Sequence, residues 1–179
     1  MKITNLEPTP NPNAFKFNIE EKLGNRARSF PDAVVAEQDP LAKILFEVEG
    51  VESIFYLGHF ITVTKEPESS TEEVLKATGQ LILDFDYTEL EELLAEEEPA
   101  SEEANEELSK INQVLDEMVR PALANDGGGL EIVGYDNNTL FIQYQGACGT
   151  CPSAARGTLM QIEMLLKHQI NPDISVVPS

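Results

Sequence analysis

The sequence has few cysteines and no tryptophan, and it lacks any long hydrophobic run. Two of its 179 residues are cysteines. That number is far too small for a disulfide-dense secreted scaffold. It is also too small for a metal cage within one chain, which usually takes four ligands. No apolar run approaches the roughly 18 residues that a membrane span needs, so the sequence predicts no membrane partner.

Basic residues are also scarce. Lys and Arg number 12 against 32 Asp and Glu, which gives a formal net charge of -20. Nucleic acid binding needs Lys and Arg to neutralise phosphates, and the sequence has no basic run, so we expect no nucleic acid partner. The N-terminus has neither an apolar signal core nor an Arg- and Ser-rich amphipathic stretch. We therefore expect a cytoplasmic protein, in which thiols stay reduced.

The acidic residues gather between positions 84 and 107, where twelve Asp and Glu occur without a Lys or Arg. Within this stretch, AEEEPASEEANEE (95–107) has too little apolar content to offset the entropy cost of ordering it. The sequence therefore predicts an acidic flexible linker at 93–106. It would join two small α+β domains, one at 1–92 and one at 107–179.

The elements of the first domain follow from periodicity and capping. The predicted elements are a strand at 15–19, a helix capped by Asp39, a hairpin at 51–65 and a second helix capped by Ser70 or Thr71.

The second domain is predicted to have the order α-β-β-α-β. Its first helix begins near Leu108, and Pro121 is expected to kink or end it near Arg120. A hairpin at 130–146 around Asn137-Asn138, a helix at 153–169 and a strand at 173–179 complete the predicted order.

Both cysteines lie in the stretch GACGTCPS (146–153), between the end of a predicted strand and the start of a predicted helix. Pro152 suits the first helical turn. The start of a helix carries partial positive charge, which favours thiolates. Gly146 and Gly149 allow close backbone approach. The pattern favours two reactive thiolates at Cys148 and Cys151 over a buried inert pair.

Three kinds of chemistry remain open for this pair: thiol–disulfide exchange, zinc binding and iron–sulfur binding. A thioredoxin-like site needs considerable chain after the motif, but 28 residues follow Cys151. Among the other metal-binding residues, His59 lies in the hairpin turn of the other domain. His168 lies at the far end of the last helix, roughly 25 Å from its start at about 1.5 Å per residue. One chain thus offers two ligands, and a homodimer would offer four.

The stretch VLDEMVRPALANDGGGLEIVGYDNNTLFIQYQGACGTCPSAARGTLMQIEMLL (114–166) resembles the NifU C-terminal, or Nfu-type, domain. TPNPNAFKF (9–17), PLAKILFEVEGV (40–51) and FITVTK (60–65) resemble the Nfu N-terminal domain. The resemblance implies an iron–sulfur cluster scaffold or carrier, not an enzyme. Cys148 and Cys151 of two chains would hold one [4Fe–4S] cluster between them.

By the same resemblance, the chain would work with upstream assembly factors and deliver its cluster to apo-proteins by exchange of thiolate ligands. The N-terminal domain would select partners. A CxxC oxidoreductase and a structural zinc-bridged dimer stay as alternatives. Supporting roles around the cluster are expected for further residues: backbone shaping by the Asp126, Gly127 and Gly128 turn, a contribution from Gly146, Gly149 and Pro152, and charge compensation by Arg156.

Overall fold

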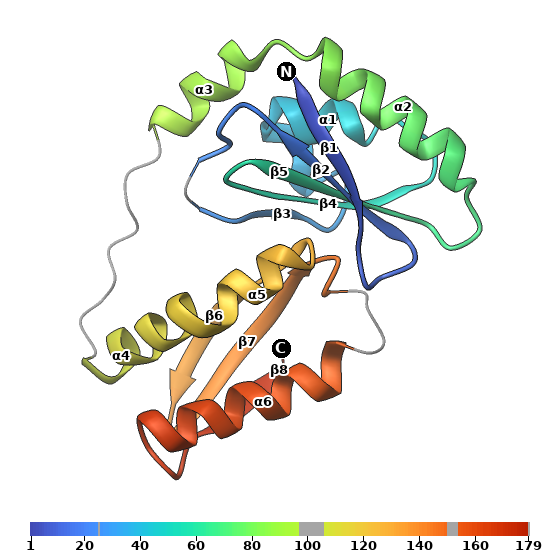
Figure 1. Ribbon diagram of the computed structural model, residues 1–179. Coiled ribbons are helices and arrows are strands. Elements are labelled where there is room, and N and C mark those ends of the chain that lie inside the picture. Colours follow the sequence, from blue (N-terminus) through green and yellow to red (C-terminus); the bar gives the residue numbers. More distant parts are fainter. Residues whose placement is uncertain (25, 97–105, 150–153, 179) are drawn as a thin grey trace. The chain divides into compact units, whose positions relative to one another are not determined.

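The computed structural model describes residues 1–24, 26–96, 106–149 and 154–178. The chain divides into two compact units, Met1–Glu98 and Pro99–Ser179. Each unit has its own β-sheet and its own helices (Figure 1). The predicted α+β class is therefore confirmed.

The first unit is built on an antiparallel sheet with the strand order β1-β2-β5-β4-β3. The β4–β5 hairpin and β2 lie where alternation predicts them, whereas β1 and β3 were not predicted. The strands are β1 (Ile3–Pro8), β2 (Ala14–Ile19), β3 (Arg28–Phe30), β4 (Val51–Leu57) and β5 (Phe60–Lys65).

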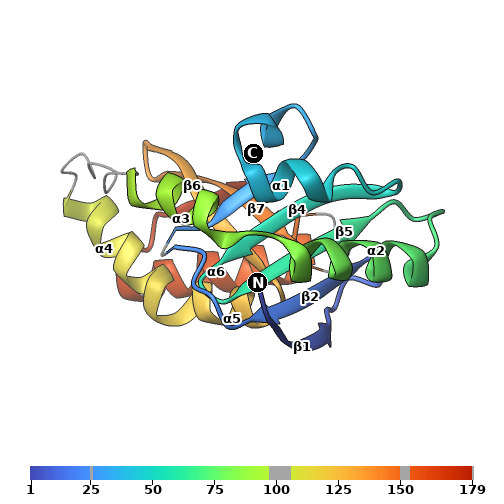
Figure 2. The same ribbon diagram turned by 90° about the horizontal axis from the view of Figure 1, so that it is seen from above.

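Two helices of the first unit begin at the predicted caps. The Asp39 carboxylate accepts a hydrogen bond from the Ala42 backbone N–H at 2.8 Å, and the Ser70 hydroxyl accepts one from the Glu73 N–H at 3.4 Å. The helices pack on one face of the sheet and bury its apolar side chains (Figures 1 and 2). The helical elements are η1 (Val35–Gln38), α1 (Pro40–Leu45), α2 (Thr71–Asp84) and α3 (Tyr87–Glu96).

Helix α3 occupies the first residues of the predicted linker. Leu90 is fully buried, and Leu93 and Leu94 pack against the core of the first unit. The spacing of these leucines gives α3 an apolar face, so its glutamates need not oppose folding. Helical structure therefore extends past position 92 to Glu96. Residues 97–105 lie outside the described part of the chain, and their linker role stays a prediction.

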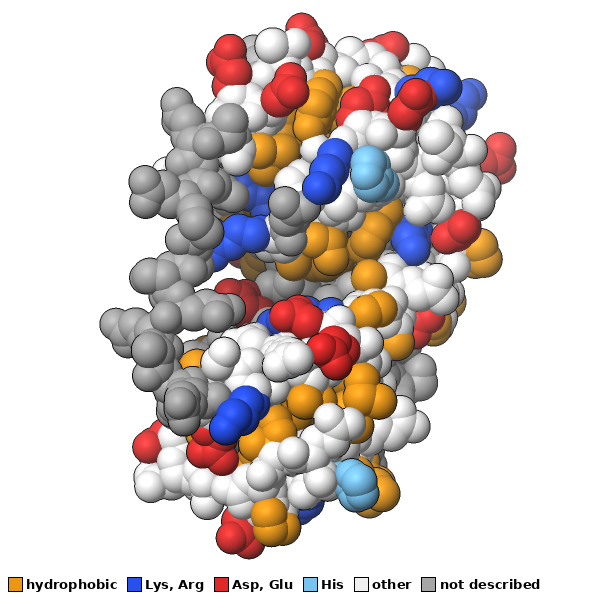
Figure 3. Space-filling model, turned by 60° about the vertical axis from the view of Figure 1, so that its left-hand side comes forward, with side chains coloured by type: hydrophobic (Ala, Val, Ile, Leu, Met, Phe, Trp, Pro, Cys, Tyr) orange, Lys and Arg blue, Asp and Glu red, His pale blue; other side chains and the backbone are white. Residues whose placement is uncertain are grey.

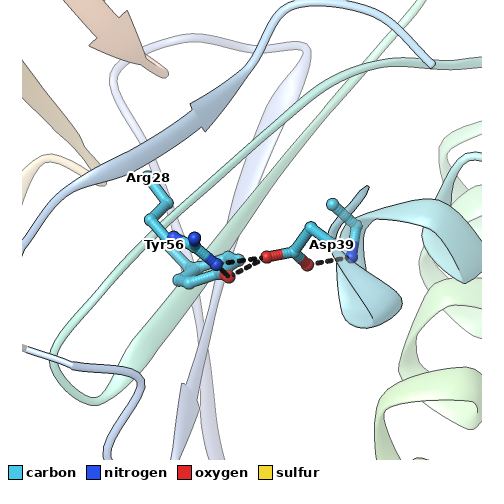
Figure 4. A network of polar contacts seen from close by, with 4 residues as sticks. Arg28, Asp39 and Tyr56 are labelled. Carbon is cyan, nitrogen blue, oxygen red and sulfur yellow. Dashed lines mark hydrogen bonds and ion pairs between the residues drawn. The ribbon is translucent and has the colours of Figure 1, made fainter. Parts of the chain in front are cut away.

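A buried polar network ties α1 to the sheet of the first unit. Asp39 is 3% exposed. Its second carboxylate oxygen accepts hydrogen bonds from the Arg28 guanidinium at 2.7 Å and from the Tyr56 hydroxyl (Figure 4). Burial, followed by the Asp39 charge, raises the pKa of Tyr56 above its ordinary value. The cap of one helix is thus connected to two strands.

The second unit follows the predicted order α-β-β-α-β. Strands β6 and β7 are antiparallel, and β8 adds to β7 in parallel. Its elements are α4 (Glu106–Val114), a π-helical turn η2 (Leu115–Val119), α5 (Arg120–Asn125), β6 (Gly128–Asp136), β7 (Thr139–Gly146), α6 (Ala154–Gln169) and β8 (Ser175–Pro178).

Sequence analysis predicts that Pro121 kinks or ends the first helix near Arg120, and the structure interrupts the α-helix there: α4 ends at Val114, and α5 begins at Arg120 after η2. The wide turn η2 precedes the proline, and the Arg120 N–H donates to the Leu115 carbonyl. Pro121 then falls at the start of α5, where a missing backbone N–H costs little. The π turn thus lets the helical segment pass the proline.

The hairpin of the second unit turns at Asn137 and Asn138, whose φ angles are 48° and 60°. Two such residues form the tight turn that suits twisted strands. On β7, Leu140 and Ile142 are buried under the helices, while Phe141 between them is 37% exposed. The alternation of buried and exposed side chains along β7 therefore defines the inner face of this sheet.

Acidic side chains are scattered over the visible surface of each unit, among hydrophobic, polar and a few basic side chains (Figure 3). Among the described residues, no helix combines the length and apolar character that crossing a membrane requires.

Candidate functional site

The segment that begins at Gly146 and carries both cysteines, called the cysteine loop below, follows β7 through a tight turn. Gly146 has a φ of 62°, a value that favours glycine. The Gly149 N–H donates to the Gly146 carbonyl at 3.0 Å, and the Ala147 N–H donates to the Gly127 carbonyl at 3.2 Å. Backbone hydrogen bonds therefore hold the first half of the loop in place.

The Asp126–Gly128 turn supplies the other side of the site. It ends α5, because the Asp126 and Gly127 N–H groups donate to the carbonyls of Ala122 and Ala124 at 3.2 and 3.1 Å. It then starts β6, where Gly128 pairs with Gly146 of β7. The structure thus brings this turn and the cysteine loop together, although 20 residues separate Gly128 from Cys148.

Cys148 is buried in this site, with 6% of its surface exposed. It belongs to the hydrophobic core of the second unit, and its sulfur lies directly over Gly128. A Cβ atom at Gly128 would be 2.5 Å from Cys148 Sγ. Sequence analysis favoured two reactive thiolates over a buried inert pair. Cys148 is buried, because the glycine opposite it leaves space that the thiol fills; its reactivity stays a prediction.

Other predicted site residues are described less fully. Cys151 and Pro152 lie outside the described residues. Arg156 is the third residue of α6, but its side chain is not among those described, so its proposed charge compensation stays a prediction. The structure therefore assembles Cys148 with the Asp126–Gly128 turn.

Tyr144 is a residue of this site that sequence analysis did not single out. It lies on β7 two residues before Gly146 and packs against the same core as Cys148. Burial, followed by the nearby charge of Cys148, raises the pKa of Tyr144 to about 12. The alternation of Leu140, Ile142 and Tyr144 places it on the inner face, but nothing in the spacing connects its hydroxyl with the cysteine loop.

Within the described ranges, no group of three or more His, Cys, Asp or Glu side chains is placed to hold a metal ion. His59 Nδ1 lies 3.2 and 3.1 Å from the backbone carbonyls of Glu20 and Glu21 in the first unit. His168 lies in the last turn of α6. Among the described residues of the second unit, no contact is found between His168 and the cysteine loop, so Cys148 is the candidate donor that the described part of this site offers.

The two units match two family models. Residues 3–89 match the model described as "Scaffold protein Nfu/NifU N terminal", and residues 111–177 match the "NifU-like domain". A chain with both units in this order is of the two-domain NifU-like class.

Similar proteins support this assignment over nearly the whole chain. The NFU1 iron-sulfur cluster scaffold homolog, mitochondrial, of Homo sapiens is 37% identical over 178 residues, covering 96% of this chain and 69% of that protein. Its counterpart in Drosophila ananassae is 32% identical, covering 96% of this chain and 62% of that protein. The chain thus spans between three-fifths and seven-tenths of the length of these relatives. It belongs to the Nfu family of iron–sulfur cluster scaffold proteins.

A solved structure is also similar. The crystal structure of protein SAV1430 from Staphylococcus aureus has 31% sequence identity and a TM-score of 0.41, and it matches 46% of this chain and 99% of that chain.

The human and Drosophila relatives are named as scaffolds and not for a catalysed reaction. They are also named as mitochondrial, so the cytoplasmic location expected from the sequence stays a prediction.

Proposed function

We propose that two copies of this chain hold one [4Fe–4S] cluster between them and deliver it to apo-proteins. Cys148 and Cys151 of each copy would supply the four thiolate ligands that such a cluster takes. The observation that carries this proposal is the placement of Cys148. It lies in a loop shaped by glycines, in a chain of the Nfu family, with no other donor cluster among the described residues.

The chemistry of the site suits a cargo that is held and then released. Because the ligands come from two chains, separating the chains opens the site. In each exchange, a thiol of the acceptor loses its proton and forms an Fe–S bond, while the bond from iron to Cys148 or Cys151 breaks. The released thiolate takes up a proton, so electrons and protons balance without a further reagent.

The burial of Cys148 weighs against thiol–disulfide exchange as the main activity. Such exchange requires a thiolate that can reach a disulfide sulfur of the substrate. A thiol that is 6% exposed does not offer that access. Cluster binding would instead require the Cys148 side chain to turn away from Gly128 when a second copy and the cargo arrive.

Partners would be recognised outside the cysteine pair. The first unit contains no cysteine, so we assign it to partner selection, both of upstream assembly factors and of apo-protein acceptors. The net charge of -20 would favour approach by basic surfaces. No nucleic acid or membrane partner is proposed.

Anaerobic reconstitution with iron and sulfide tests the proposal. We expect about four iron and four sulfide per two chains, a visible absorption band, and a native mass that corresponds to two chains plus the cluster. Cys148→Ser and Cys151→Ser should each lose the cluster. His168→Ala is the matched control, because His168 lies at the other end of α6, and it should load like the unmodified chain.

The loaded protein is then mixed with an apo-ferredoxin, and cluster transfer is followed by the acceptor's absorption. Stoichiometric zinc without iron uptake would contradict the proposal in favour of a structural zinc dimer. Disulfide reductase turnover by a single chain would contradict it in favour of redox chemistry.

A further inference from the structure

Tyr144 borders the cysteine loop. Its backbone lies close to the loop, and its side chain is on the inner face of the β6–β7 hairpin. It pairs with Leu130 of β6, on the inner face of the hairpin. Its own carbonyl oxygen borders the loop closely, since a Cβ atom at Gly149 would be 3.2 Å from it. Tyr144 and Cys148 pack into one hydrophobic core. A change at the Tyr144 ring would therefore alter the packing around Cys148.

The hydroxyl of Tyr144 is buried and has no hydrogen-bond partner among the residues that the structure describes. A buried hydroxyl without a partner loses its hydration without compensation, whereas a phenylalanine would fill the same apolar space without that cost. Buried polar groups of this kind call for a specific partner. The Cys148 sulfur lies over Gly128, which is two residues before Leu130, the strand partner of Tyr144, on the same face of β6. Diagonal neighbours on one face of a hairpin are within reach of an aromatic side chain, so the sulfur is a neighbour that the hydroxyl can serve.

We propose that Tyr144 is a positioning residue, whose hydroxyl donates a hydrogen bond to the Cys148 sulfur when that sulfur carries negative charge. The sulfur is charged as a free thiolate and as a ligand of the cluster. For the loaded protein this inference rests on the proposed function. Hydrogen bonds to ligand sulfurs raise the reduction potential of a cluster and fix the orientation of the ligand.

Tyr144→Phe removes the donor and keeps the ring, and Tyr135→Phe is the matched control. Tyr135 is also a tyrosine packed against this core, but it pairs with Leu140 near the other end of the hairpin. In reconstituted protein, we expect Tyr144→Phe to shift the reduction potential to a more negative value. Release of iron to a chelator should become about tenfold faster, as is common for losses of outer-shell partners.

A purely structural role for Tyr144 would change unfolding without changing the potential. An unchanged potential and iron release rate in Tyr144→Phe, with normal loading, would overturn the inference. Equal changes in reduction potential and iron release rate in Tyr144→Phe and Tyr135→Phe would also overturn it. The changes would then not depend on the hydroxyl next to Cys148.

The cluster-free chain gives a second readout. Iodoacetamide alkylation of Cys148 is followed at pH 8 by mass spectrometry of the cysteine peptide. Losing a hydrogen bond to the thiolate should slow alkylation roughly threefold for each unit of rise in the thiol pKa, because greater nucleophilicity offsets part of the loss. Equal rates in Tyr144→Phe and the unmodified chain would refute the inference. If the unmodified chain takes up no iron, the proposed function fails, and this measurement still decides the role of Tyr144.

Discussion

The Cys148 sulfur occupies space that a side chain at Gly128 would need, since a Cβ atom at Gly128 would lie 2.5 Å from Cys148 Sγ. The same Cβ atom would be 2.7 Å from the Gln145 carbonyl oxygen, which is backbone and cannot turn away. A glycine is therefore needed for this resting position of the thiol.

Gly128→Ala is expected to destabilise the second unit by about 1–3 kcal/mol, the usual cost of overpacking a core. It should also displace the thiol and speed its reaction with a disulfide reagent. Chemical denaturation and thiol kinetics measure the two effects. Gly157→Ala is the control, because nothing lies within 4 Å of its added Cβ atom, and alanine in a helix should be more stable by roughly 0.5–1 kcal/mol. Equal stability of the two variants would contradict this account.

Asp39→Ala should destabilise the first unit strongly. It removes the carboxylate that pairs with Arg28 and Tyr56 and that caps α1. Breaking a buried charge pair from one side costs about 3–5 kcal/mol, and amide hydrogen exchange in α1 and β4 measures the loss. Glu37→Ala removes an exposed partner of Lys43, 3.2 Å away, and should cost less than about 1 kcal/mol. A similar loss of stability in both variants would mean that the buried network adds nothing to the stability of the first unit.

The hairpin turn provides a test of backbone conformation. Asn137 has a φ of 48°, a region that costs roughly 1–2 kcal/mol for most residues with a Cβ atom. Asn137→Val should lower the stability of the second unit by about that amount, while Asn137→Gly should be neutral or slightly stabilising. Thermal unfolding of the two variants checks the prediction. A valine variant as stable as the glycine variant would show that this turn has another conformation.

Glu163 should make the second unit sensitive to acid. Its carboxylate accepts hydrogen bonds from the Lys167 ammonium at 2.6 Å and from the Val176 N–H at 3.0 Å. The Lys167 bond, followed by the Val176 bond, holds the pKa of Glu163 below its ordinary value. A lowered pKa in the folded state contributes stability above the unfolded value of about 4.3. That contribution is lost as the pH falls through the folded pKa.

Glu163→Gln removes this titrating group and keeps an oxygen that can accept from Val176. The stability difference between the unmodified chain and Glu163→Gln should therefore be largest above pH 5 and shrink as the pH falls below 4. Urea unfolding between pH 3 and 7 measures it. A difference that stays constant over this range would exclude Glu163 as the acid-sensitive link between α6 and β8.

The sequence predicted elements whose signals are local. The Asp39 and Ser70 caps, the 51–65 hairpin and the Asn137-Asn138 turn each depend on neighbouring residues, and each was found in place. Helix α3 was missed because its glutamates dominated the composition, although Leu90, Leu93 and Leu94 carry helical spacing. An interruption near Pro121 was predicted from its missing backbone N–H, but the π turn that carries the helical segment past the proline was not.

Only part of the candidate site could be predicted, because its central contacts join distant segments. The CxxC spacing indicates two ligands, and the glycines indicate a tight turn. That Cys148 Sγ covers Gly128, and that Tyr144 packs into the same core as Cys148, depends on how β6 and β7 pair. No spacing in the sequence encodes that contact, which is why Tyr144 emerges only from the structure.

The first unit's sheet offers little backbone at either edge for another strand to join. At one edge, β3 is three residues long. At the other edge, β1 has a register shift between Ile3 and Asn5 and ends at Pro8, which has no N–H to donate. Exposed strand edges are where sheets of different chains fuse and aggregate. Under the proposed role of the first unit in partner selection, these edges would let it contact other proteins through side chains without forming a sheet shared between chains.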